Sequence, residues 1–141
     1  MNRSSEEKIK NVKKWIDYAE GDIQLAKNAL NLLSSCPYRL IGFHAQQSAE
    51  KFLKAYLVFH DFDFPYTHDI TKLIELCTKF SKFDEKIYEA SELTFFAAAT
   101  RYPSEYDEIL REDVLRAIEL AEMIKKEILI RFQEENFPLT D

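Results

Sequence analysis

The stretch RYPSEYDEI, residues 101–109, contains an arginine that is placed to bind a phosphate. Arg101 precedes a Tyr-Pro pair at a predicted helix break, and its guanidinium can bind a phosphate through two parallel hydrogen bonds. Cleaving RNA without a metal also requires a group that transfers protons, and histidine titrates in the right pH range. No histidine occurs between Arg101 and the C-terminus. The stretch therefore has a candidate phosphate ligand but lacks the usual catalytic partner.

His68 is the first candidate to replace the missing histidine. It lies in the loop DFDFPYTHD, directly before a predicted helix that Asp69 or Thr67 can cap. The alternative is a local structural role, in which the His68 ring or Thr67 caps the helix and Asp69 orients the ring. Tyr106 is a weaker candidate, since its unperturbed pKa of about 10 makes tyrosine a poor base near neutral pH.

A second group of polar side chains falls at helical spacing within residues 38–60. The group consists of His44, Gln47, Lys51 and Lys54. Together with Arg101 it could line a groove that binds an anion. The alternative is a solvated face on which the lysine stems cover apolar surface, Glu50 neutralises one lysine and His44 makes a hydrogen bond between helices. Arg101 likewise has a structural alternative, because a cation at a helix C-terminus stabilises by about 0.3–1 kcal/mol.

The composition excludes several kinds of site. Two glycines and four prolines in 141 residues are few for a strand-and-turn fold, and neither GxGxxG nor GxxxxGK[ST] occurs, so P-loop and Rossmann chemistry are excluded. Cys36 and Cys77 form no CxxC pair, which predicts free thiols in a reducing compartment rather than a disulfide or a zinc site. We therefore expect no metal and no cofactor.

The charge is unevenly distributed along the chain. The net charge is −6, but residues 1–60 carry nine basic and six acidic side chains, whereas residues 61–141 carry ten and nineteen. This balance argues against a general nucleic-acid binder, permits a local anion-binding patch and suits a basic protein partner. No apolar run approaches membrane-spanning length, so we expect a cytoplasmic protein that does not enter the membrane.

The elements that must position these residues are predicted to be helices. Apolar residues recur every three or four positions, as in an antiparallel bundle, and Lys, Glu, Leu, Ala and Ile dominate. We expect a single all-α domain over residues 1–141, an up-and-down four- or five-helix bundle with a loose tail at 134–141. The first expected helix has about 27 residues and begins with a Ser4–Glu7 capping box, the second covers 38–60 and the third Ile70–Lys79. The fourth covers residues 85–102, with Asp84 as its cap and the inward stripe Ile87, Ala90, Thr94 and Ala97. The fifth runs from Ser104 to about Gln133.

Four segments, in this order and spacing, resemble the HEPN domain family over roughly residues 10–130. They are WIDYAEGDIQLAKNAL, FHAQQSAEKFLKAYL, PYTHDITKLI and AAATRYPSEY. The resemblance implies an all-helical bundle, commonly a homodimer, often paired with a small nucleotidyltransferase as a toxin–antitoxin system. It also implies that Arg101 matches the arginine of RNase branches that carry Arg, four to six residues, then His. At these three positions this chain instead has Tyr106, Asp107 and Glu108. Nucleotide binding is an older proposal for the family.

These observations lead to three hypotheses of function. The first is a homodimeric, non-enzymatic or weakly enzymatic module that binds a small nucleotidyltransferase partner, or a nucleotide, through a groove near Arg101. The second is a metal-independent RNase toxin in which His68 or Tyr106 replaces the missing histidine. The third is a dimeric scaffold without a ligand. The missing histidine favours a protein that is not an enzyme. The aromatic residues Phe95, Phe96, Tyr102 and Tyr106 are expected in the core and the dimer interface, with base stacking as the alternative.

Overall fold

The computed structural model describes residues 3–32, 34–99 and 108–140, and within these ranges the chain is helical without any strand. The expected all-α fold is confirmed. None of the helices in the described ranges combines the length and apolar character that a bilayer crossing requires. The elements are α1 (Arg3–Ala29), α2 (Tyr38–Phe59), α3 (Ile70–Cys77), the 3₁₀ helix η1 (Glu85–Leu93), α4 (Thr94–Ala99) and α5 (Arg111–Glu134).

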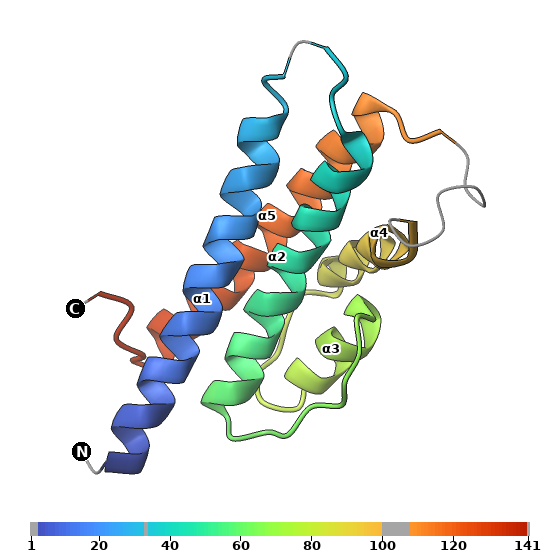
Figure 1. Cartoon of the computed structure of the whole chain (residues 1–141). Helices are drawn as coiled ribbons and strands as arrows, with labels where there is room; N and C mark the ends of the chain where they lie inside the picture. Colours follow the sequence, from blue (N-terminus) through green and yellow to red (C-terminus); the bar gives the residue numbers. More distant parts are fainter. Residues whose placement is uncertain (1–2, 33, 100–107, 141) are drawn as a thin grey trace.

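Helix α2 is the centre of the bundle, since it contacts every other element. Helix α1 runs antiparallel to it on one side, and α5 packs along it on another (Figure 1). The shorter elements α3, η1 and α4 cover the remaining side of α2, and η1 also packs on α5. Because α2 is enclosed on several sides, its polar side chains must meet partners from different elements.

The three long helices bury the apolar stripes that the periodicity predicts. Val12, Ala19, Ile23 and Ala26 of α1 are buried, as are Val114, Ala121, Ile124 and Ile128 of α5. The spacing of apolar residues alone allows either Leu40 or Ile41, and either Ile124 or Lys125, to face the core, and the structure decides both cases. Ile41 is buried while Leu40 is exposed, and Ile124 is fully buried whereas Lys125 pairs with Glu20 of α1.

The fourth predicted helix is wrong in its geometry. Asp84 caps it as expected, accepting a hydrogen bond from the Lys86 amide at 2.9 Å, but the first nine residues form the 3₁₀ helix η1. The predicted stripe assumed 3.6 residues per turn. A 3₁₀ helix has three residues per turn, so the buried residues follow at intervals of three. They are Ile87, Ala90, Leu93 and, at the start of α4, Phe96.

Two other predicted boundaries differ from the structure. Helix α1 begins at Arg3, so Ser4 is not its N-cap. Helix α5 begins at Arg111 rather than at Ser104, which lies outside the described residues. Residues 108–110 are not helical, and the Leu110 amide donates to the Asp113 carboxylate at 2.8 Å, which satisfies one donor at the new start.

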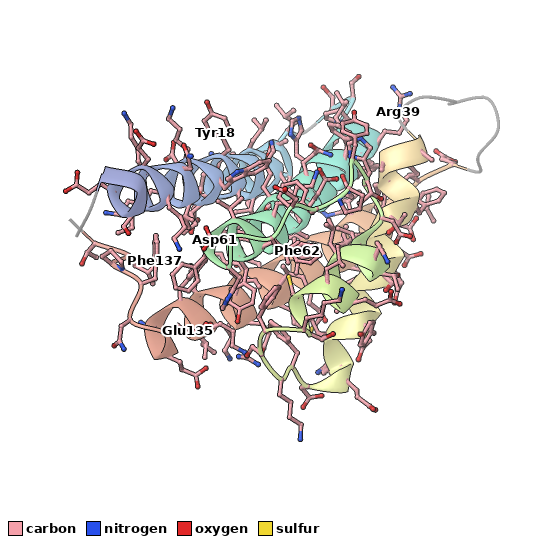
Figure 2. The ribbon with its side chains drawn as sticks, turned by 90° about the horizontal axis from the view of Figure 1, so that it is seen from below. Tyr18, Arg39, Asp61, Phe62, Glu135 and Phe137 are labelled. Carbon is pink, nitrogen blue, oxygen red and sulfur yellow. The ribbon has the colours of Figure 1, made fainter. Side chains whose placement is uncertain are left out.

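The tail after α5 is anchored up to Phe137, in contrast to the expected loose tail. The Phe137 amide donates to the Phe132 carbonyl at 2.8 Å, a contact made possible by Asn136 in the left-handed conformation at φ 60°. The Phe137 ring is buried and lies 5.4 Å from Phe59 and 4.8 Å from Phe132 between ring centroids (Figure 2). An aromatic residue near a helix end therefore closes this end of the core.

At Gly42, α2 packs directly against Phe96 of α4. A Cβ atom at this position would lie 2.2 Å from Cδ1 and 2.8 Å from Cγ of Phe96, well inside contact distance. Only glycine leaves room for the Phe96 ring at this crossing. Gly21, the other glycine, lies exposed on α1 with no atom within 4 Å of such a Cβ.

Candidate functional site

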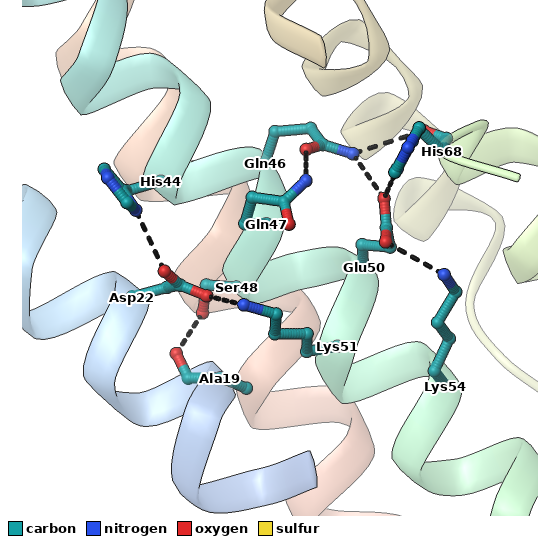
Figure 3. Close-up of polar contacts among 10 residues, drawn as sticks. All are labelled: Ala19, Asp22, His44, Gln46, Gln47, Ser48, Glu50, Lys51, Lys54 and His68. Atoms are coloured by element: carbon teal, nitrogen blue, oxygen red, sulfur yellow. Dashed lines mark hydrogen bonds and ion pairs between the residues drawn. The ribbon is translucent and has the colours of Figure 1, made fainter.

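Two residues of the predicted site, Arg101 and Tyr106, lie outside the described residues. The other candidates are His44, Gln47, Lys51, Lys54 and His68, all of them described. Figure 3 shows that these residues belong to two polar clusters on different sides of α2 rather than to a single stripe. Each cluster is organised by a carboxylate, Asp22 in one case and Glu50 in the other.

The first cluster joins α1 to α2 through Asp22. His44 Nδ1 lies 2.9 Å from Asp22 Oδ1, and Lys51 Nζ binds the second oxygen of the same carboxylate. All three side chains are partly buried. The inter-helix hydrogen bond expected as the alternative for His44 is therefore present. We name this group the Asp22 cluster; sequence reasoning missed Asp22, whose position beside the inward stripe of α1 was the available signal.

The second cluster surrounds Glu50, which is 4% exposed. Its carboxylate accepts three hydrogen bonds: from Lys54 Nζ at 2.9 Å, His68 Nδ1 at 2.8 Å and Gln46 Nε2 at 3.0 Å. Gln46 also donates to the His68 carbonyl at 3.2 Å and accepts from Gln47 Nε2 at 2.7 Å. We name this group the Glu50 cluster, and it ties the loop before α3 to α2.

The Glu50 carboxylate is ionised at neutral pH despite its burial. Burial alone would raise its pKa, but the hydrogen bonds from Lys54, Gln46 and His68 outweigh this effect and hold the pKa below its ordinary value. Lys54 is also enclosed, with 6% of its surface exposed, and its ammonium lies 5.3 Å from the ring centroid of Phe64. An anion that bound Lys54 would therefore compete with Glu50.

Glu50 orients the His68 ring. The sequence had suggested Asp69 for this role. Its Nδ1–H donates to the Glu50 carboxylate, since an ionised carboxylate only accepts, and in the neutral form of this half-buried ring Nε2 is then the acceptor nitrogen. Asp69 instead caps α3 by accepting from the amides of Thr71 and Lys72. Glu50 is the single acidic residue in the sequence of α2, which was the signal that could have identified it.

Ser48 makes a further polar contact between α1 and α2. Its fully buried hydroxyl donates to the Ala19 carbonyl at 2.8 Å. We expect Ser48→Ala to lower the free energy of unfolding by about 1 kcal/mol, the usual net value of such a bond. Urea denaturation measures this change. The matched control is Thr78→Ala, which removes an exposed hydroxyl that donates a hydrogen bond to the Glu75 carbonyl. It should lower the free energy of unfolding clearly less. Equal effects of the two substitutions would contradict the prediction.

Grouped metal ligands and reactive thiols are the other kinds of site that the described residues could form. Within the described ranges, no three His, Cys, Asp or Glu side chains are grouped so that they could hold a metal ion. Cys36 and Cys77 are free thiols, as expected. Burial raises the pKa of Cys77, which keeps this thiol protonated and unreactive.

Comparison with known proteins decides the family. A profile of the HEPN domain matches residues 12–131, most of the chain. The chain belongs to the HEPN domain family. This HEPN chain is similar in fold to TT1696 from Thermus thermophilus, with a TM-score of 0.73 and 24% identity over 83% of this chain and 94% of that one. It is also similar to ST0689, an archaeal HEPN homologue, with a TM-score of 0.66 and 27% identity over 85% and 96% of the two chains. No curated protein matches it significantly.

In this HEPN domain the polar residues of the two clusters make contacts between elements of the fold. The Asp22 cluster links α1 to α2, and the Glu50 cluster links α2 to the loop before α3. Neither cluster presents a lysine that lacks a carboxylate partner. The anion-binding role of His44, Gln47, Lys51 and Lys54 stays a prediction.

Proposed function

We propose that this HEPN protein is a homodimeric binding module whose partner is a protein, a small nucleotidyltransferase of a toxin–antitoxin pair. The observation that carries the proposal is the pairing of Lys51 with Asp22 and of Lys54 with Glu50. A phosphate-bearing ligand at either cluster would have to break an ion pair for each cation that it gained. A protein partner has no such requirement.

The charge distribution supports the same proposal. Residues 61–141 carry ten basic and nineteen acidic side chains, so the half of the chain that forms α3, η1, α4 and α5 is strongly negative. Such a surface repels nucleic acid and attracts a partner with a basic face. Nucleotide binding through Arg101 is a subordinate part of the proposal.

Co-expression with the product of a neighbouring nucleotidyltransferase gene tests this function. We expect an equimolar complex in size-exclusion chromatography with light scattering, and we expect the isolated HEPN chain at twice its 16.6 kDa mass. A monomer that forms no complex would overturn the proposal. A thermal shift with millimolar ATP would establish the nucleotide as a ligand, because ligand binding to the folded state raises its stability.

A second candidate function, RNA cleavage without a metal, is favoured by the orientation of His68. Because Glu50 holds Nδ1, the other ring nitrogen is available to accept the proton of a 2′-hydroxyl while Arg101 binds the phosphate. The same purified sample decides between the two. If it cleaves RNA in a chelator and His68→Ala abolishes cleavage while the variant stays folded and still forms the protein complex, the second function holds.

A further inference from the structure

A groove runs between η1 and α5, next to α4. It consists of two hollows of about 470 and 420 Å³ that share Arg116 and Leu120 as lining residues. Apolar side chains line the first hollow, among them Leu93, Phe96 and Leu120. Phe95 also lines it, with 42% of its surface exposed. We name this feature the η1–α5 groove.

The charged side chains that line the η1–α5 groove are predominantly acidic. Eight carboxylates and three cations line the two hollows. Two of the carboxylates are paired with cations outside the groove, Glu122 with Lys27 and Glu127 with Arg131. The other six are Asp84, Glu89, Glu92, Glu108, Asp113 and Glu119. An apolar lining with acidic neighbours fits a ligand that is itself apolar and basic.

Arg116 shows that these carboxylates can hold a guanidinium. Its Nη2 lies 2.8 Å from Glu89 Oε1 and 3.4 Å from Glu92 Oε2, and its Nη1 lies 3.0 Å from Glu119 Oε1. Glu92 and Glu119 remain 60% and 72% exposed in this arrangement. A carboxylate has about four lone-pair sites, so these two can accept a further cation.

We propose that the η1–α5 groove is the docking surface for the protein partner, and that it takes a basic segment with one large apolar side chain. The apolar side chain enters the hollow beside Phe95 and Phe96, and a flanking arginine or lysine pairs with Glu92 or Glu108. The inference rests on the proposed function and adds where the partner binds and which chemistry it presents.

The same observations argue against two other occupants of the groove. A phosphate or an RNA strand would bring negative charge against the acidic lining. A second copy of this chain that docked through its own η1–α5 groove would bring carboxylates against carboxylates around the twofold axis. A basic partner is the occupant whose charge complements the groove.

Charge reversal in the groove tests the proposal. The groove variant is Glu92→Lys with Glu108→Lys; both residues are exposed, and Arg116 keeps its contacts with Glu89 and Glu119. The control variant is Asp17→Lys with Asp63→Lys, which makes the same change in net charge at exposed positions outside the groove. The measurement is the affinity for the purified nucleotidyltransferase by calorimetry. We expect binding roughly tenfold weaker in the groove variant and nearly unchanged in the control.

A second variant separates the apolar contribution from the charge. Phe95→Ala keeps every charge and should also weaken binding roughly tenfold, because it removes an aromatic contact of the apolar hollow. If the groove variant and Phe95→Ala both bind the partner as tightly as the wild type, the docking surface is wrong and the proposed function stands. If the wild type itself does not bind, the proposed function fails and the docking inference fails with it. If the groove variant dissociates the homodimer instead, the occupant is a second copy and the proposal is overturned.

Discussion

Glu50→Gln is expected to lower the free energy of unfolding by about 3–5 kcal/mol, although it replaces one oxygen atom by a nitrogen. The substitution removes the negative charge that Lys54 requires, and both side chains are almost fully buried. An unpaired ammonium in this place keeps its desolvation cost without compensation. The new amide would also direct N–H groups toward the donors Gln46 or His68. Urea denaturation followed by circular dichroism measures the loss.

Two further variants make this prediction specific. Glu122→Gln breaks the exposed pair with Lys27 and should cost less than about 1 kcal/mol, as is usual at a surface. Glu50→Gln combined with Lys54→Met should recover much of the loss, because the buried positive charge leaves together with its partner. Equal costs for Glu50→Gln and Glu122→Gln, or no recovery in the double variant, would contradict the account.

The stability of the wild type should also depend on pH through Glu50. The folded state lowers the pKa of this carboxyl below the ordinary value of 4.5. Its contribution is therefore complete above pH 4.5 and is lost as the pH falls through the folded-state pKa. In Glu50→Gln this part of the acid dependence should be missing, so the free energy of unfolding should fall less steeply with acid below pH 4.5.

Gly42→Ala and Gly21→Ala are expected to change stability in opposite directions. Both add one methyl group within a helix, which by propensity alone stabilises by about 0.5–1 kcal/mol. At Gly21 the methyl group meets no atom, so the gain should be realised. At Gly42 it would overlap the Phe96 ring, and overpacking of this kind costs about 1–3 kcal/mol.

The thermal melting temperatures of the two variants provide the measurement. We expect Gly42→Ala to melt below the wild type and Gly21→Ala at or above it. The helical context is the same for both, so a difference in sign reports the contact with Phe96 rather than backbone propensity. A Gly42→Ala protein as stable as Gly21→Ala would mean that α4 can move away from α2 without cost.

The long helices were predictable because each has one buried face with a regular period. The stripe from Val12 to Ala26 places α1 without knowledge of its neighbours, and the Asp69 cap before Ile70 needs only local chemistry. The 3₁₀ geometry of η1 was missed although Ile87, Ala90 and Leu93 repeat every three residues. That pattern also fits the early part of an α-helical stripe, and tertiary packing decides between them.

The candidate site was less predictable, because its contacts join residues far apart in the chain. His44, Lys51 and Lys54 were identified from their types and spacing on α2. Their carboxylate partners could not be assigned in the same way, since the pairing of Asp22 with His44 depends on how α1 is turned relative to α2. The loop that brings His68 to Glu50 has no periodic pattern from which its path could be derived.

The two clusters have a consequence for how many packings α2 can adopt. Apolar contacts have no preferred direction, so a helix held by them alone can slide or rotate against its neighbours at little cost. Asp22 of α1 pairs with His44 and Lys51 of α2, whereas Glu50 of α2 pairs with His68 of the loop before α3, and each contact has a defined geometry. A shift of α2 by one residue would separate Asp22 from His44 and Lys51, and Glu50 from His68, while these groups remained partly away from water. The two clusters thus select one alignment of the central helix with its neighbours.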